Sequence, residues 1–269
     1  MDQALTGSLR RFADGVNQLL DGELAALYLF GSAVYDDLHP GYSDLDFFAV
    51  SARPLTAADF DASLALRKEL KESGDLYLPM LEGEFVWRGA LGNGFDHPVL
   101  FWGTTRELLK QRYGLAGFSL RGLLERGVLL AGTDVRGEIP PPDDALMLGE
   151  VVRMVGTLRR WAAVTNEDIH SADWLFLTCQ SLFWLRTGQV AGKSAAARWA
   201  LGTFTDPWCA ALPAALALRQ NPVLAAEPDR KAWLAALGPT VQAACDRLER
   251  EAAACHQRMG ATGVWTPPV

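Results

Sequence analysis

The sequence lacks the features of secreted, membrane-spanning and metal-thiolate proteins. Its four cysteines show no CxxC spacing, which argues against a disulfide framework or a structural zinc site. Its four histidines form no HxxxH pair, and its apolar runs are shorter than a membrane span. The chain starts Met1-Asp2-Gln3 and continues into a helical pattern. We therefore expect no secretory leader, no membrane contact and a cytoplasmic protein.

Basic residues are also fewer than acidic ones. The 269 residues include 32 acidic and 25 basic side chains, which gives a formal net charge of −7. Because nucleic-acid binding relies on clusters of lysine and arginine, this balance argues against a nucleic-acid partner. It suits a cationic small molecule, which a negatively charged site attracts. The length allows one large domain or two ordinary domains.

The segment Leu27–Val50, LYLFGSAVYDDLHPGYSDLDFFAV, is the most informative part of the chain. It predicts an apolar strand, a Gly31-Ser32 turn, a polar loop and a strand that opens with Asp44 and Asp46. Side chains alternate along a strand, so both carboxylates are expected on one face, where a cation such as Mg²⁺ would offset their repulsion. The Gly-Ser turn offers N–H groups and a hydroxyl to a phosphate. The alternative interpretation is an acidic edge strand after a solvated loop.

A third strand is predicted over Leu76–Trp87, LYLPMLEGEFVW, and it carries two more acids. Glu82 and Glu84 are two residues apart and therefore share a face. Either one could complete a metal-and-base cluster with the two aspartates. We favour Glu82, and Glu84 is the alternative base.

A proline-rich break, Pro140–Asp144, divides the chain into two predicted domains, residues 1–142 and 143–269. The first is expected to be mixed, with strands and helices, and the second to be wholly helical. In the first, strands are predicted over Leu24–Phe30, Asp44–Val50, Pro98–Trp102 and Val128–Leu130. Helices are predicted there over residues 4–22, Pro54–Leu70 and Leu108–Glu125, the last of them broken near Gly114 and Gly117. In the second, helices are predicted over Ala145–Thr165, Asp173–Arg186, Ser194–Leu201, Leu212–Leu218 and Arg230–Met259.

Lys193 stands at the head of a predicted helix, after a Thr187-Gly188 stop, and is one of only five lysines. A lysine there opposes the helix macrodipole, so nothing local favours it. A nucleotide phosphate would relieve the mismatch. The alternative is a solvated surface lysine.

Taken together, the motifs GSAV, SDLD, LEGEFV, GVLLAG and TGQVAGKSAAARWAL resemble the aminoglycoside adenylyltransferases that modify streptomycin and spectinomycin. The resemblance extends over nearly the whole chain. It implies an α+β polymerase β-like nucleotidyltransferase domain, with a mixed sheet flanked by helices, followed by a helical bundle. The bundle would close a cleft for ATP and substrate, and the activity would confer antibiotic resistance.

The same resemblance implies roles for individual residues. Asp44 and Asp46 would bind two Mg²⁺ ions, Glu82 would be the base, and Gly31 and Ser32 would hold the ATP triphosphate. Lys193 would contact the ATP phosphates. AMP would pass from ATP to a hydroxyl of the antibiotic, with release of pyrophosphate, and we expect a monomer.

The chain also departs from the family pattern. The loop between the Gly-Ser turn and Asp44 is one residue longer than expected, and Gln180 replaces an arginine. The segment Glu167–Trp174, EDIHSADW, does not match closely where acceptor contacts are expected. Its candidates for binding a cationic acceptor are Glu167, Asp168, Asp173 and Trp174, although the Leu-Phe-Leu that follows Trp174 favours its interpretation as a core residue.

Three functional hypotheses follow. The first is an O-adenylyltransferase for aminoglycosides. The second is a nucleotidyltransferase that modifies a protein or another metabolite, and the third is a nucleotide-binding regulator without turnover. The intact acids favour turnover, and the acidic EDIHSAD segment favours a cationic small molecule. The identity of the nucleotide is open.

Overall fold

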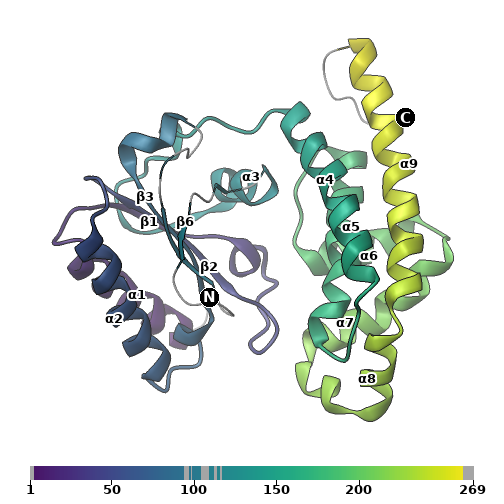
Figure 1. The fold of residues 1–269 in the computed structure, drawn as a ribbon, viewed down its shortest axis with the longest axis horizontal. Coiled ribbons are helices and arrows are strands. Elements are labelled where there is room, and N and C mark those ends of the chain that lie inside the picture. Colours follow the sequence, from purple (N-terminus) through teal and green to yellow (C-terminus); the bar gives the residue numbers. More distant parts are fainter. Residues whose placement is uncertain are drawn as a thin grey trace. The chain divides into compact units, whose positions relative to one another are not determined.

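The computed structural model describes residues 3–93, 97, 99–103, 109–111, 114–115 and 117–262. The chain divides into two compact units, Met1–Pro141 and Pro142–Val269, within the run of prolines that starts at Pro140. The first unit contains a sheet with helices, and the second is built from helices in its described part (Figure 1).

A mixed sheet forms the centre of the first unit. Its strands follow the order β5-β4-β3-β2-β1-β6. Strands β2 and β3 are parallel, and the other neighbouring strands are antiparallel. The strands are β1 (Leu24–Leu29), β2 (Leu45–Ser51), β3 (Leu81–Trp87), β4 (Val99–Trp102), β5 (Leu109–Gln111) and β6 (Val128–Gly132).

Two hydrophobic cores cover the two faces of this sheet. Helices α1 (Gln3–Leu19) and α2 (Ala57–Glu72) pack on the face that carries Phe47 and Phe85. Helix α3 (Gly117–Arg126) packs on the opposite face, which carries Phe48 and Val86. Alternation along β2 and β3 puts Asp46 and Glu82 on the α3 face.

Local sequence signals explain where helices begin and end. Thr56 and Asp59 form a capping box at the start of α2, as predicted for Thr56. Gly22 stands after α1 with a φ of +81°, a left-handed conformation that favours glycine, so the predicted stop is confirmed. Gly188, with a φ of +69°, likewise ends α5 (Asp173–Thr187).

The second unit is a helical bundle. Helix α4 packs against α9, and α5 packs against both α6 and α9. Its core is apolar and includes Val151, Phe176, Cys179 and Leu248. The helices are α4 (Asp144–Ala162), α5 (Asp173–Thr187), α6 (Lys193–Thr203), α7 (Leu212–Gln220), α8 (Pro228–Ala235) and α9 (Gly238–Thr262).

Three predicted elements differ in the structure. The third strand starts at Leu81, because Asp75 accepts hydrogen bonds from the backbone of Tyr77 and Leu78 and turns the chain there. Leu109–Gln111 is a strand, not a helix, because it pairs with β4; residues 108, 112, 113 and 116 of that predicted helix lie outside the described residues.

The predicted Arg230–Met259 helix is two helices, broken between Ala235 and Gly238. A side-chain carbon on Gly238 would lie 2.4 Å from the Ala162 carbonyl oxygen. Glycine therefore allows the start of α9 to approach the end of α4 closely.

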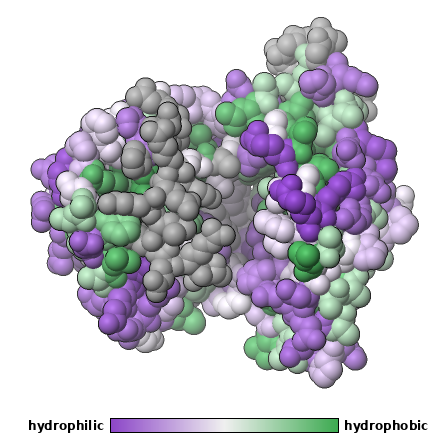
Figure 2. Space-filling model, in the orientation of Figure 1, coloured by the Kyte–Doolittle hydropathy of each residue, from purple (hydrophilic) through white to green (hydrophobic). Residues whose placement is uncertain are grey.

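None of the described helices is both long and apolar enough to cross a membrane. On the face of the helical bundle that Figure 2 shows, hydrophilic residues cover much of the surface between smaller hydrophobic groups.

Candidate active site

The Gly31-Ser32 turn lies directly against the Asp44/Asp46 motif. Gly31 begins a short 3-10 turn, η1 (Gly31–Tyr35), with a φ of +66°. A side-chain carbon at Gly31 would lie 1.9 Å from Oδ2 of Asp46, so the carboxylate occupies the space that any other residue would fill. The Ser32 hydroxyl donates to the Asp44 carbonyl oxygen at 3.2 Å. Both conformation and space therefore require glycine at this position.

Hydrogen bonds within the intervening loop hold the two halves of the motif together. The Asp37 backbone N–H donates to the Ser32 carbonyl oxygen at 3.0 Å. The Asp37 side chain is buried and lies 3.3 Å from His39, and the His39 backbone N–H donates to the Ser43 hydroxyl. The sequence analysis predicted no role in the site for Asp37, His39 or Ser43. Their only signal in the sequence is a cluster of turn-forming polar residues.

The register between β2 and β3 puts a third carboxylate, that of Glu82, next to Asp46. Asp46 on β2 is directly opposite Glu82 on the parallel strand β3. Both side chains are half-buried, whereas Asp44 precedes the strand and is exposed. The turn, Asp46 and Glu82 thus meet at one edge of the sheet.

Glu84 is in a different environment, although it shares the face of Glu82. It lies between Phe48 and Phe101 of the neighbouring strands and is only 2% exposed. Its Oε2 atom has no hydrogen-bond partner among the described residues. Burial raises the pKa of the Glu84 carboxyl to about 8, because the charged form is poorly solvated there. Glu82 is the more accessible of the two candidate bases.

The arrangement does not form a closed metal cage. Among the residues described, no group of three or more His, Cys, Asp or Glu side chains could hold a metal ion. Asp44 and Asp46 remain a two-carboxylate motif beside a phosphate-type turn. Mg²⁺ is commonly held by one or two carboxylates together with substrate phosphate oxygens, so the donor set suits that ion.

In the helical bundle, Lys193 already has an anionic partner. It is the first residue of α6, and its Nζ lies 3.1 Å from Oδ1 of Asp173 in the first turn of α5. The helix-dipole argument did not predict this partner, which lies twenty residues earlier in the chain. Gln180 donates from Nε2 to the Ala191 carbonyl oxygen at 2.7 Å and so braces the loop before Lys193.

The other predicted acceptor-binding residues lie at the start of α5 and just before it. Asp168 caps the short turn η5 (Ile169–Ala172), and hydrogen bonds from the His170 backbone and ring hold its pKa below the usual range. Glu167 is exposed and 4.0 Å from Lys231. Trp174 packs against Trp161 of α4, with the ring centroids 4.0 Å apart and the ring planes tilted by 36°. Trp174 is half-buried, so it is neither a full core residue nor a fully exposed one.

Residues 9–80 match the family model described as a nucleotidyltransferase domain. This match covers the Gly-Ser turn and both aspartates, so this part of the first unit is similar to a domain of the nucleotidyltransferases, a class of enzymes.

The fold as a whole is similar to a particular solved structure, the spectinomycin adenyltransferase AAD(9) from Enterococcus faecialis with ATP and spectinomycin. The TM-score is 0.64 at 18% sequence identity, covering 90% of this chain and 98% of that chain. At this identity the likeness shows a shared fold. A search of curated proteins found no match. The predicted α+β fold, with a nucleotidyltransferase domain followed by a helical domain, is confirmed.

Proposed function

We propose that the protein transfers AMP from ATP to a hydroxyl group of an aminoglycoside-type antibiotic of the streptomycin or spectinomycin kind, with release of pyrophosphate. The observation that carries this proposal is the position of Asp46, which lies against Gly31 and opposite Glu82. A phosphate-type turn, a carboxylate suited to a metal and a candidate base thereby share one sheet edge. The solved relative, whose structure contains ATP and spectinomycin, supports the choice of substrates.

Asp44 and Asp46 would bind the Mg²⁺ ions that accompany ATP. Their carboxylate chemistry suits the ion, and the missing side chain of Gly31 leaves room for the Asp46 carboxylate. When bound, Mg²⁺ would supply positive charge to the phosphate oxygens. Gly31 and Ser32 would orient the triphosphate through backbone N–H groups and a hydroxyl.

Glu82 would be the general base. It would take the proton of the acceptor hydroxyl as the oxygen forms a bond to the α-phosphorus and the bond to pyrophosphate breaks. Glu84 is the weaker candidate, because it lies buried between two phenylalanines and its raised pKa keeps it largely protonated at neutral pH.

The helical bundle would contribute contacts to both substrates. Lys193 would exchange its Asp173 partner for a nucleotide phosphate. Glu167 and Asp168 have exposed carboxylates that would attract the ammonium groups of the acceptor, and the Trp161–Trp174 pair offers an aromatic surface to a sugar ring. Asp173 would contact the acceptor only once Lys193 has released it.

The test is a product assay on the purified full chain with ATP, Mg²⁺ and, separately, streptomycin, spectinomycin and other aminoglycosides. The proposal expects pyrophosphate release that depends on the antibiotic, and an antibiotic whose mass has increased by one AMP. AMP attached to a protein or another metabolite instead would favour the second hypothesis. ATP binding without turnover on any acceptor would favour a regulator.

A further inference from the structure

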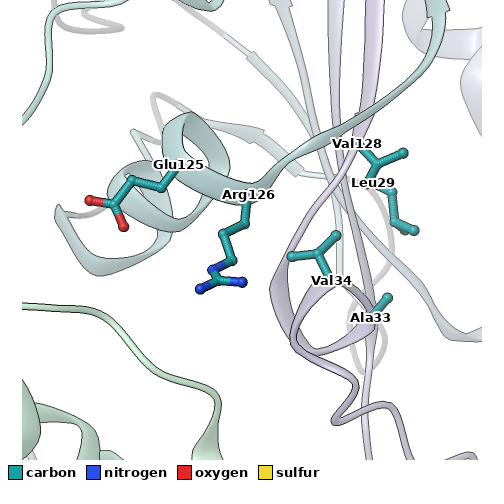
Figure 3. Close-up of a pocket in the computed structure, with 6 residues that line it drawn as sticks. All are labelled: Leu29, Ala33, Val34, Glu125, Arg126 and Val128. Carbon is teal, nitrogen blue, oxygen red and sulfur yellow. The ribbon is translucent and has the colours of Figure 1, made fainter.

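A pocket of about 450 Å³ opens beside the Gly31-Ser32 turn (Figure 3). It is lined from four elements of the first unit: β1, η1, the end of α3 and the start of β6. The lining residues are Leu29, Ala33, Val34, Glu125, Arg126 and Val128. Because Val128 is paired with Leu29 across β6 and β1, the end of α3 reaches the same sheet edge as Gly31.

Arg126 provides the positive charge of this pocket. Its side chain is exposed, and its guanidinium carbon lies 5.5 Å from the centre of the Tyr35 ring. Figure 3 shows the Arg126 side chain extending from the end of α3 into the space beside Val34 of η1. Among the described residues, no carboxylate forms an ion pair with it, whereas Arg88 and Arg136 are each paired with an acid.

The acidic residue in the pocket is already neutralised by a neighbour. Glu125 accepts a hydrogen bond from Nε of Arg121, one turn earlier on α3, at 2.8 Å. Figure 3 shows its carboxylate directed away from Val34. The pocket therefore offers a net cationic site.

Packing fixes Arg126 relative to the turn. Leu120 and Leu123 anchor α3 in the core under the sheet. Tyr35, the last residue of η1, packs against Gly122, where a side-chain carbon would lie 3.3 Å from the tyrosine hydroxyl. Arg126 and the Gly31-Ser32 turn are thus parts of one packed assembly.

Strand order gives the direction in which a triphosphate would extend. The candidate metal and base residues are on β2 and β3, the turn follows β1, and the pocket lies on the far side of β1, toward β6. Asp46 and Glu82 lie on the face of the sheet that α3 covers, so a triphosphate that extended from them across the turn toward β6 would bring its terminal phosphates to Arg126 at the end of α3.

From this geometry we infer that Arg126 binds the β- and γ-phosphates of the nucleotide, the part that leaves as pyrophosphate. The inference rests on the proposed function. A guanidinium presents planar, paired donors that match phosphate oxygens, and it stays charged throughout the reaction. The group is positioned to bind the negative charge that gathers on the leaving pyrophosphate.

The test is calorimetric titration of the full chain with Mg²⁺-pyrophosphate, Mg²⁺-ATP and AMP. Four variants are compared with the unmodified protein: Arg126→Ala, Arg126→Met, Arg126→Lys and Arg11→Ala. Arg126→Met keeps an apolar stem over Tyr35 but has no charge. Arg11→Ala is the matched control, since Arg11 is a half-exposed arginine of α1 that pairs with Glu69.

The Ala and Met variants are expected to bind pyrophosphate and ATP about tenfold more weakly or worse, and the Lys variant to be intermediate. AMP binding should be unchanged, and Arg11→Ala should bind all three ligands normally. Unchanged pyrophosphate binding by both uncharged variants, with normal binding by the unmodified protein, would overturn this inference alone. An unmodified protein that binds neither pyrophosphate nor ATP would overturn the proposed function as well.

Discussion

In the first unit, Asp46 and Glu82 come together through the pairing of two strands, whereas in the second Lys193 and Asp173 meet through an ion pair between two helices. The strand pair sets two like charges side by side, an arrangement that gains stability from a bound cation. The helix pair neutralises its own charges. Under the proposed function, a ligand of the first unit would meet a pair of acids, whereas a ligand of Lys193 would have to replace Asp173.

The largest effect is expected from Asp46→Asn, which removes a metal-binding charge and leaves the volume nearly unchanged. The rate of AMP transfer should fall by about 10³-fold or more, since a metal ion supplies several kcal/mol of transition-state stabilisation. Asp61→Asn, on the exposed face of α2, is the matched control and should retain full activity. Near-normal turnover by the Asp46 variant would remove the basis for the proposed mechanism.

The second-largest effect is expected from Glu82→Gln. Compared with Glu84→Gln, it tests which of the two acids on this face of β3 is the general base. The loss of a general base typically lowers a rate by about 10²–10⁴-fold, and kcat should show it. Glu84→Gln should retain most of the activity. If Glu84→Gln were the inactive variant and Glu82→Gln the active one, the buried residue would be the base.

Glu84→Gln should instead change stability. The pKa of the Glu84 carboxyl is about 8 in the folded protein and about 4.5 without burial, so the folded state binds the proton more tightly. Stability should therefore fall as pH rises from about 4.5 to 8. The glutamine variant should be more stable at pH 7 by roughly a few kcal/mol. Denaturant unfolding at pH 5, 7 and 8.5 measures this, and parallel pH profiles for both proteins would contradict it.

The smallest effect is expected in the helical bundle. Lys193→Ala should weaken ATP binding by several-fold, because one charge-assisted phosphate contact is lost. Asp173→Asn removes the competing partner of the lysine, so ATP should bind at least as tightly as to the unmodified protein. Calorimetric titration with Mg²⁺-ATP separates the two variants. Equal affinity for Lys193→Ala and the unmodified protein would leave the Lys193–Asp173 pair with a structural role only.

Much of the first unit could be predicted because its signals are local. The Gly31-Ser32 turn, the strand that follows Asp44 and the Thr56 cap each depend on a few consecutive residues. Leu109–Gln111 could not be predicted as a strand, because only its pairing with β4 makes it one.

The site was predicted less completely, because burial and partner choice depend on distant residues. Alternation put Glu82 and Glu84 on one face, but only the register shows that Phe48 and Phe101 enclose Glu84. Lys193 and Asp173 are twenty residues apart, and no local rule pairs them.

The close contact between Gly31 and Asp46 also bears on how this protein can change over generations. Because the carboxylate fills the space beside the glycine, the two positions are coupled: a larger residue at 31 must displace the acid, and a longer acid at 46 must displace the turn. Neither position can drift independently of the other. In a library of random variants, we expect both positions to be among the least tolerant of the first unit, even though neither residue belongs to its hydrophobic cores.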